Sequence, residues 1–451
     1  MSSETPSGQA TSREHRRHDR EIVRLAVPAF LALVAEPMFL LADSAIIGHL
    51  GTPELAGLGI AGAIISTAVG LCVFLAYGTT ASVARQIGAG QTRAALTQGM
   101  DGVWLAVIIG SLATVGGIVL SGALVGLFPG GPEVTEHATT YLRWAFLGMV
   151  PLLVMLATTG VLRGLQDTRT PLYVAVAGNL VNIALNLLLV YGLDLGIAGS
   201  AIGTVLAQAA SAAVLVAVVV RAVRREGASL RPDLPGVRRA AHAGAALVVR
   251  TLTLRASLLV MTYSAAALGA TSVATNQLAL TVWTFLAFAL DAIAIAAQAI
   301  TGRFLGAGDV AGTRTVTERM IWWGVLSGVA TGLMLAATAP FLGPLFTDDP
   351  AVHDLLWPVL LVAAVFQPVA GVVFVLDGVL IGAGDGRYLA WGGLLVLAVF
   401  APLALLTAWA QPAAGSPLVW LWVSFGVGFM GARAVVLLRR ARGERWMVTG
   451  A

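Results

Sequence analysis

Hydrophobic residues are gathered into long blocks along the chain, and polar residues lie mainly in the short segments between them. Each block reaches the roughly 20 apolar residues that a membrane-spanning helix needs. The apolar runs are continuous, whereas β-barrel strands alternate apolar and polar positions. The pattern predicts an all-α polytopic membrane protein with twelve transmembrane helices, at residues 22–47, 54–82, 96–128, 136–160, 171–192, 197–220, 243–267, 272–301, 316–346, 352–380, 387–410 and 417–438.

Arginines lie in alternate connections between these blocks. Arg85, Arg163 and the run 221–239 fall on one side of the membrane if the N-terminus is inside, while the acidic turns FPGGPEVTEH and FTDDPAVHD fall on the other. Connections on the cytoplasmic side carry the excess of Lys and Arg in membrane proteins. We therefore expect a multi-pass protein of the cell membrane with both termini in the cytoplasm.

Composition excludes several other classes of protein. The 451 residues are 58% hydrophobic and only 11% charged, whereas soluble domains carry about 25% charged residues. The net charge of +4 does not indicate nucleic-acid binding, because the basic residues lie between apolar blocks and form no stripe. The single cysteine, Cys72, gives neither a disulfide framework nor a cysteine-based metal site.

The two halves of the chain repeat each other at a constant offset. HLGTPELA, IGAG, LFPGGPEV and GVLRGLQD in the first half match ALGATSVA, LGAG, LFTDDPAV and GVLIGAGD, each 218 residues further on. Repeats of this kind indicate duplicated units. We therefore predict a disordered cytoplasmic tail at 1–21, six-helix bundles at 22–220 and 243–440, a basic cytoplasmic connector at 221–242 and a cytoplasmic tail at 441–451.

Six helices per half give both halves the same orientation, so the predicted repeat is parallel, with its axis along the membrane normal. Two such bundles enclose a cavity and allow alternating access, which is transporter architecture. The sequence contains no GxxxxGK[ST] phosphate loop, so an ion gradient is the simpler energy source. Carriers of the major facilitator class have a Gly-Xaa3-Asp-Arg turn where this chain reads RQIGAGQTR.

Five segments together resemble the multidrug and toxic compound extrusion (MATE) family, in the branch of DNA-damage-inducible protein F. They are AEPMFLLADSAIIGHLG, ARQIGAGQ, GVLRGLQDTRTPLY, GNLVNIALNLLLVYGL and DAIAIAAQAITGRFLGAGD. The resemblance covers residues 22–440 and implies cation-coupled export of organic cations and other amphiphiles. We expect a monomer in the lipid bilayer that binds a small amphiphilic substrate, no nucleic acid and no cofactor, with H⁺ as the coupling ion and Na⁺ as the alternative.

Acidic and amide side chains lie inside predicted transmembrane helices. Glu36 and Asp43 are seven residues apart, which places both carboxylates on one helix face. Charges inside the bilayer are costly and therefore indicate function, and two neighbouring carboxylates in a low dielectric favour retaining a proton. Asn179, Asn182 and Asn186 share one face of the fifth helix. These five residues form the predicted proton or cation site.

This polar set is confined to the first half. The residues 218 positions after Asp43, Asn182 and Asn186 are Met261, Phe400 and Ala404. The resembling family has a first-helix Asp and a fifth-helix Asn followed four residues later by an acid; Asp43 and Asn182 match, and Asn186 departs from the acid. The alternative is that the polar side chains only fix helix packing.

For the other polar residues inside the predicted helices, structural roles compete with functional ones. Thr204 and Gln208 share a face of the sixth helix, and these two, with Gln277 and Gln298, are candidate cavity residues, although amides often join packed helices. In the second half we expect structural ion pairs, because an unpaired buried charge is costly; a second ion site is the alternative. The residues concerned are Arg250, Arg255, Asp291 and Asp377.

The sequence therefore favours a secondary antiporter that exports cationic amphiphiles in exchange for protons. A sodium-coupled exporter, a flippase for lipid-linked precursors and uptake instead of export are the alternatives. A flippase would need several arginines for pyrophosphate, and only Arg250 and Arg255 are available. We expect no enzyme, because the six histidines lie mostly in tails and turns.

Overall fold

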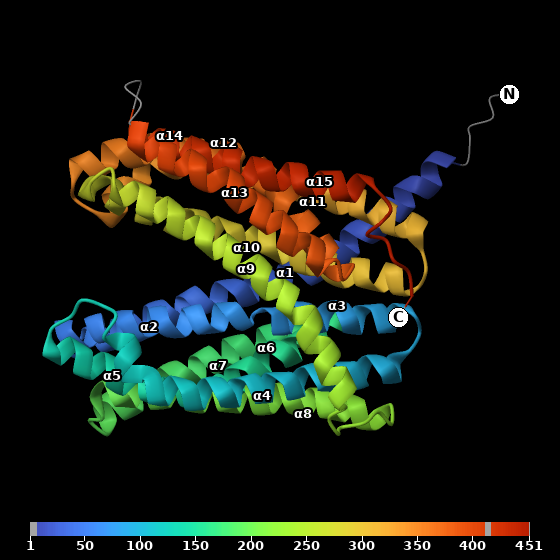
Figure 1. Ribbon diagram of the computed structural model, residues 1–451. Helices are drawn as coiled ribbons and strands as arrows, with labels where there is room; N and C mark the ends of the chain where they lie inside the picture. The colour runs from blue at the N-terminus through green and yellow to red at the C-terminus, as the bar shows by residue number, and fades with distance from the viewer. Residues whose placement is uncertain (1–6, 411–415, 451) are drawn as a thin grey trace. The chain divides into compact units, whose positions relative to one another are not determined.

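The computed structural model describes residues 7–410 and 416–450, with side chains from His15 onward, and the described residues form helices and no strands. The elements are α1 (Ser7–Gly48), α2 (Thr52–Cys72), α3 (Phe74–Gly88), α4 (Thr92–Val125), α5 (Pro132–Leu147), α6 (Met149–Gly164), α7 (Arg169–Leu187), η1 (Leu188–Gly192), α8 (Gly196–Arg225), α9 (Leu234–Ala266), α10 (Ala270–Gly306), α11 (Val310–Phe346), α12 (Pro350–Gly382), α13 (Gly386–Ala410), α14 (Pro417–Ser424), η2 (Phe425–Gly431) and α15 (Ala432–Arg442) (Figure 1). The elements η1 and η2 are π-helical.

The predicted all-α, polytopic fold is confirmed. Among the described residues, 11 helices are long and apolar enough to cross a membrane, and the number is 12 if α5 and α6, which meet at a bend of 49°, form one span. The bend lies at Gly148, where the side-chain oxygen of Gln208 occupies the space of a Cβ atom. Glycine therefore allows α8 to approach the chain closely at this point.

The chain folds into two compact units. The N-terminal unit comprises 31–245, and the C-terminal unit comprises the described residues up to Phe30 together with those from Ala246 to Gly450. The chain passes from one unit to the other twice, each time inside a continuous helix, α1 or α9. The first part of each of these helices therefore packs in a different unit from the remainder.

The structure differs from the expected disordered tail at 1–21, because α1 already begins at Ser7; residues 1–6 lie outside the described part of the chain. Ion pairs hold this first part of α1 in the C-terminal unit. The Arg319 guanidinium donates to both carboxylate oxygens of Asp19 at 2.6 and 2.7 Å, and Trp323 donates to Asp19 at 2.8 Å. Arg303 pairs with Glu21 at 2.7 Å.

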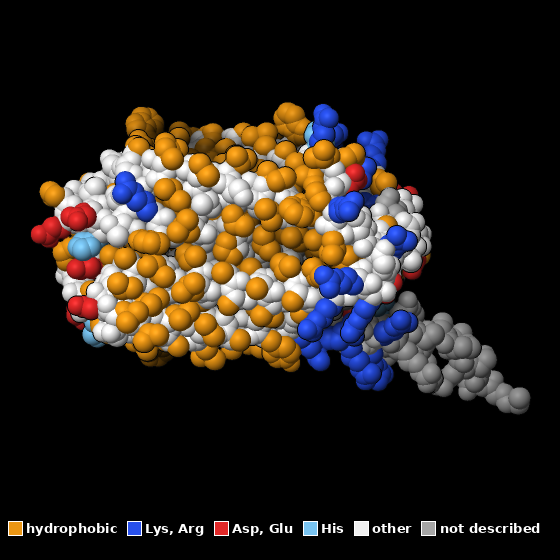
Figure 2. Space-filling model, turned by 90° about the horizontal axis from the view of Figure 1, so that it is seen from below, with side chains coloured by type: hydrophobic (Ala, Val, Ile, Leu, Met, Phe, Trp, Pro, Cys, Tyr) orange, Lys and Arg blue, Asp and Glu red, His pale blue; other side chains and the backbone are white. Residues whose placement is uncertain are grey.

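Small residues bring the helices of the N-terminal unit into close contact. A Cβ atom on Gly160 would meet the backbone of Ala76, and one on Gly164 would meet Val83 and the carbonyl of Thr80, so α6 lies directly against α3. Small residues at helix contacts are typical of membrane bundles. On the face that Figure 2 shows, apolar side chains cover the middle, most Arg side chains lie at one end, and a group of Asp and Glu side chains lies at the other.

The C-terminal unit is built on α10, α11 and α12. A Cβ on Gly328 would meet the backbone of Gln367 and Pro368, and one on Gly378 would meet the backbone of Ala294, so α12 lies close to both α11 and α10. Rings from several helices fill the core: Phe425 stacks on Phe429 with ring centroids 5.0 Å apart, and Phe400 lies 5.9 Å from Phe425.

Candidate functional site

Asp43 lies in the interior of the N-terminal unit and accepts three hydrogen bonds. Asn186 and Ser200 donate to its Oδ1 atom at 2.8 and 2.6 Å, and the Tyr141 hydroxyl donates to Oδ2 at 3.3 Å. Asp43 is only 3% exposed, and it forms no ion pair with any residue that the structure describes. The carboxylate is therefore held by neutral donors alone.

The hydrogen bonds continue from Asp43 through the amides of α7. The Asn186 amide nitrogen also donates to Asn182 at 3.1 Å, and Asn182 donates to the Thr204 hydroxyl at 3.0 Å. The Asn186 oxygen is buried without a hydrogen-bond partner. It lies where a Cβ atom on Gly203 would be, so the glycine makes room for this amide. The cluster thus contains one unused acceptor beside the carboxylate.

Helical spacing explains how these side chains converge. Asn182 and Asn186 are four residues apart on α7, and Ser200 and Thr204 are four apart on α8, so each pair lies on one helix face. Ser200 and Tyr141 were not among the predicted site residues. Extending the Thr204 and Gln208 spacing back by four residues would have found Ser200. Tyr141 carries no such signal, because only the packing of α5 brings it to Asp43.

Other predicted site residues of the N-terminal unit lie outside this cluster. Asn179 donates to the backbone carbonyl of Ala35 at 2.8 Å and so joins α7 to α1. Glu36, the next residue, is exposed and has no hydrogen bond or ion pair with a described residue. Gln208 is half-buried against Gly148. The carboxylates of Glu36 and Asp43 therefore differ in environment.

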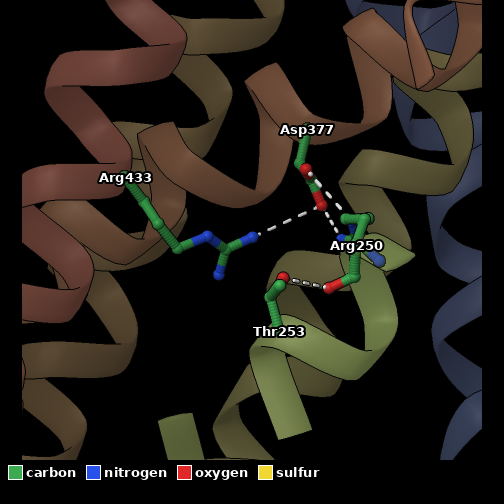
Figure 3. A network of polar contacts seen from close by, with 4 residues as sticks. All are labelled: Arg250, Thr253, Asp377 and Arg433. Atoms are coloured by element: carbon green, nitrogen blue, oxygen red, sulfur yellow. Dashed lines mark hydrogen bonds and ion pairs between the residues drawn. The ribbon is translucent and has the colours of Figure 1, made fainter. Parts of the chain in front are cut away.

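The C-terminal unit contains a cluster of three charged residues. Arg250 on α9 pairs with Asp377 on α12, and Arg433 on α15 reaches the same carboxylate at 3.4 Å (Figure 3). Thr253 donates to the carbonyl of Arg250 at 2.7 Å, and the Arg433 guanidinium lies 5.4 Å from the Phe429 ring centre. All three charged side chains are at least 86% buried.

Arg433 was missed, although a charged residue in the last apolar block signals the need for a partner as clearly as Arg250 does. Arg255, in contrast, is exposed and forms no ion pair with a described residue. Asp291 is half-buried on α10. Gln277 is exposed and Gln298 is buried, both on α10.

Within the described part of the chain, no group of three or more His, Cys, Asp and Glu side chains is arranged to hold a metal ion.

Comparisons with known proteins agree with this architecture. The family model MatE matches residues 28–188 and 246–409, and its two segments begin 218 residues apart, the offset of the internal repeat. The chain is similar to the chloroplastic protein DETOXIFICATION 44 of Arabidopsis thaliana, with 30% identity over 89% of this chain and 78% of that protein. It is 28% identical to DNA damage-inducible protein F of Escherichia coli, over 94% and 92% of the two chains.

Solved structures show the same fold. The Vibrio cholerae MATE transporter VcmN in its bent form superposes with a TM-score of 0.87 at 22% identity, covering 96% of this chain and 99% of that one. A transporter of the wider superfamily from Pyrococcus furiosus superposes with a TM-score of 0.85 at 21% identity, covering 94% and 95%. The fold and the repeated match define a multi-pass membrane transporter, not an enzyme. The chain belongs to the MATE family of multidrug transporters and resembles its DNA-damage-inducible protein F branch.

Proposed function

We propose that this transporter exports amphiphilic organic cations in exchange for protons, with Asp43 as the residue that binds and releases the proton. The observation that carries the proposal is a buried carboxylate held only by neutral donors, Asn186, Ser200 and Tyr141. An acid inside a membrane is costly unless it serves transport or finds a partner. Asp43 can gain or lose a proton without leaving a neighbouring cation unpaired.

The Asn186 amide can form a hydrogen bond with Asp43 in both protonation states of the carboxyl group. The ionised Asp43 accepts from the Asn186 amide nitrogen, while the Asn186 oxygen has no partner. A protonated carboxyl has one hydrogen to donate, and rotation of the Asn186 amide by half a turn brings its oxygen toward that hydrogen. The amide therefore stabilises both protonation states. Asn182, which accepts from Asn186 and donates to Thr204, transmits the rotation to α8.

The same oxygens suit Na⁺, because hard cations prefer oxygen ligands. The unpartnered Asn186 oxygen beside the Asp43 carboxylate is the observation that supports a sodium-coupled exporter as the second candidate. For orientation, we propose that the arginine-rich end lies in the cytoplasm of the cell, because positive residues remain inside. We further propose that the protein acts as a monomer in the cell membrane.

The test uses the full-length protein in proteoliposomes with separately imposed proton and sodium gradients. Asp43→Asn keeps the side-chain volume but cannot release a proton, so proton-driven export should fall at least tenfold. Thermal stability should stay within about 1 kcal/mol, because Asn still offers an acceptor to the neutral donors. The readout is export of a fluorescent cationic dye together with thermal unfolding in detergent.

The matched control is Asp101→Asn, which alters the other buried aspartate of this unit; its carboxylate accepts the backbone N–H of Asp233 at 3.2 Å, outside the Asp43 cluster. The control should retain proton-driven export. If Asp43→Asn exports like the parent protein at several pH values, the proton site is refuted. If a sodium gradient alone drives the parent, Asp43 remains the coupling residue and the ion is Na⁺.

A further inference from the structure

The helix α9 has two opposite faces in the C-terminal unit. Thr253, Ser257, Met261 and Ser264 are all buried. Three of these side chains, Thr253, Ser257 and Ser264, are small and carry a hydroxyl group. The hydroxyls of Thr253 and Ser257 donate to backbone carbonyls of the same helix, which allows close packing. The opposite face exposes Leu252, Arg255, Leu259 and Tyr263.

Arg255 is the charged residue of this exposed face, and it lies far from the ends of the apolar span. Eleven residues separate it from Ala266 at the end of α9, which is about 16 Å at the helical rise. In the other direction, Arg239 at the basic connector is 16 residues away, or about 24 Å. An apolar membrane core is about 30 Å thick. Arg255 is therefore placed near its middle, beyond the usual reach of a side chain to the lipid headgroups.

A guanidinium at this depth is costly unless it faces water or an anion. Two other arginines inside apolar helices of the C-terminal unit, Arg250 and Arg433, contact Asp377. Arg255 has no ion pair with any residue in the described part of the chain. Its neighbours Leu252, Leu259 and Tyr263 offer apolar and aromatic surface. The exposed face of α9 thus combines one fixed positive charge with a surface suited to the apolar part of an amphiphile.

We propose that Arg255 is a specificity residue that recognises an acidic group on the exported compound. This inference rests on the proposed export function and narrows its substrate class. The substrate is an amphiphile that carries a carboxylate, sulfonate or phosphate in addition to its cationic group. Arginine binds such groups through two parallel hydrogen bonds, and it remains charged at any physiological pH, so recognition by Arg255 is independent of the protonation of Asp43.

A matched pair of dyes tests the inference. A rhodamine with a free carboxyl group and its methyl ester share the same cationic ring system and differ only in the negative charge. We expect Arg255→Gln to reduce proton-driven export of the free acid at least tenfold and that of the ester by less than twofold. Arg255→Lys keeps the charge but not the paired hydrogen bonds, so it should retain part of the export of the acid. Leu259→Ala on the same face is the steric control and should affect both dyes alike.

Binding of each dye to the detergent-solubilised protein is measured by fluorescence polarisation. This measurement distinguishes a failure of the proposed export function from a failure of the inference about Arg255. If the parent exports neither dye but binds the acid in a manner that Arg255→Gln weakens tenfold, the proposed export function fails, while recognition of an acidic group by Arg255 is supported. If Arg255→Gln binds and exports both dyes like the parent, or weakens both equally, the inference is overturned. A parent that binds and exports only the ester overturns it as well.

Lipid phosphate is the other source of an anion for Arg255. The export measurement is therefore repeated in vesicles of phosphatidylcholine alone and of phosphatidylcholine with phosphatidylglycerol. Recognition of the substrate predicts the same tenfold difference between the dyes in both lipids. If the effect of Arg255→Gln is equal for the two dyes and changes with the content of phosphatidylglycerol, Arg255 binds lipid headgroups and the inference is wrong.

Discussion

The N-terminal and C-terminal units each bury an aspartate, but they hold it in opposite ways. Asp43 accepts hydrogen bonds from an amide and two hydroxyl groups, whereas Asp377 is bound by the guanidinium groups of Arg250 and Arg433. Neutral donors tolerate a protonated carboxyl group. Two buried guanidiniums disfavour protonation, because it removes the negative charge that both of them contact. The first cluster can change charge at a small cost, and the second is fixed.

The internal repeat allows the two units to be compared at equivalent positions. The residue 218 positions after Asp43 is Met261. The same offset takes Asn182 to Phe400, which packs against the rings of Phe425 and Phe429. Conversely, the position matching Arg433 in the N-terminal unit is Leu215, which is buried. Neither unit therefore repeats the cluster of the other, and the position that matches Asp377 is Thr159. One fold accommodates both clusters.

The largest effect is expected from Asp377→Asn. This substitution removes the carboxylate that the buried Arg250 and Arg433 side chains both contact, and breaking a buried ion pair from one side costs about 3 to 5 kcal/mol. Thermal unfolding and the yield of monodisperse protein in detergent measure the loss. Asp385→Asn is the control, because Asp385 pairs with Arg440 nearer the helix end, with side chains 15% and 22% exposed. We expect about 1 kcal/mol there.

A variant in which all three charged residues are replaced shows whether the loss of stability comes from unbalanced charge or from lost packing. Replacing Arg250, Asp377 and Arg433 together with Met, Leu and Met should recover most of the lost stability, since apolar residues often substitute for buried ion pairs without loss. If Asp377→Asn instead folds as well as the parent and loses only proton-driven export, the roles assigned to the Asp43 and Asp377 clusters are wrong. The ion site would then belong to the C-terminal unit.

Much of this architecture is predictable from the sequence because hydrophobicity and the repeat act over whole helices. The apolar blocks predict the spans, and the offset of 218 predicts the duplication that the family match repeats. The first part of α1 is different. Its attachment to the C-terminal unit depends on Asp19 meeting Arg319 and Trp323, some 300 residues away in the chain. No local pattern indicates which distant unit a helix end will join.

The candidate site was predictable only in part, for a similar reason. Asp43, Asn182 and Asn186 stand out because each is polar within an apolar helix, and helical spacing groups the two amides. Ser200 shares the helical spacing of Thr204 and Gln208, but Tyr141 is an ordinary residue for a helix surface, so only the packing of α5 assigns it to Asp43. Helical spacing also places Glu36 on the same face as Asp43, yet the structure exposes Glu36 and buries Asp43.

A second prediction addresses the neutrality of the Asp43 cluster. Asn186→Asp places a second carboxyl group within hydrogen-bonding distance of Asp43, since the present contact is 2.8 Å. Two carboxyl groups this close cannot both ionise easily, so the pair shares a proton and retains it at higher pH. The pH at which proton-driven export is half-maximal should therefore move upward by about one unit or more. A pH series in proteoliposomes measures the shift.

Asn179→Asp is the control for this shift. Its amide donates to the carbonyl of Ala35 and not to Asp43, so the new carboxyl group lies outside the cluster. We expect a lower yield of folded protein from the lost hydrogen bond, with the pH dependence of the remaining export unchanged. If both variants shift the profile equally, the effect reports general negative charge in the N-terminal unit and not a shared proton at Asp43.

The smallest effect is expected from Glu36→Gln, which tests whether burial or position on α1 decides the coupling role. Glu36 is exposed, and its carboxylate has no partner among the described residues. Substitutions away from buried networks usually change stability by less than about 0.5 kcal/mol, and proton-driven export should fall less than threefold. Export rate against pH, measured beside Asp43→Asn, gives the comparison. A loss as complete as that of Asp43→Asn would mean that both carboxylates carry protons, and that an exposed acid on α1 contributes to coupling as much as the buried one.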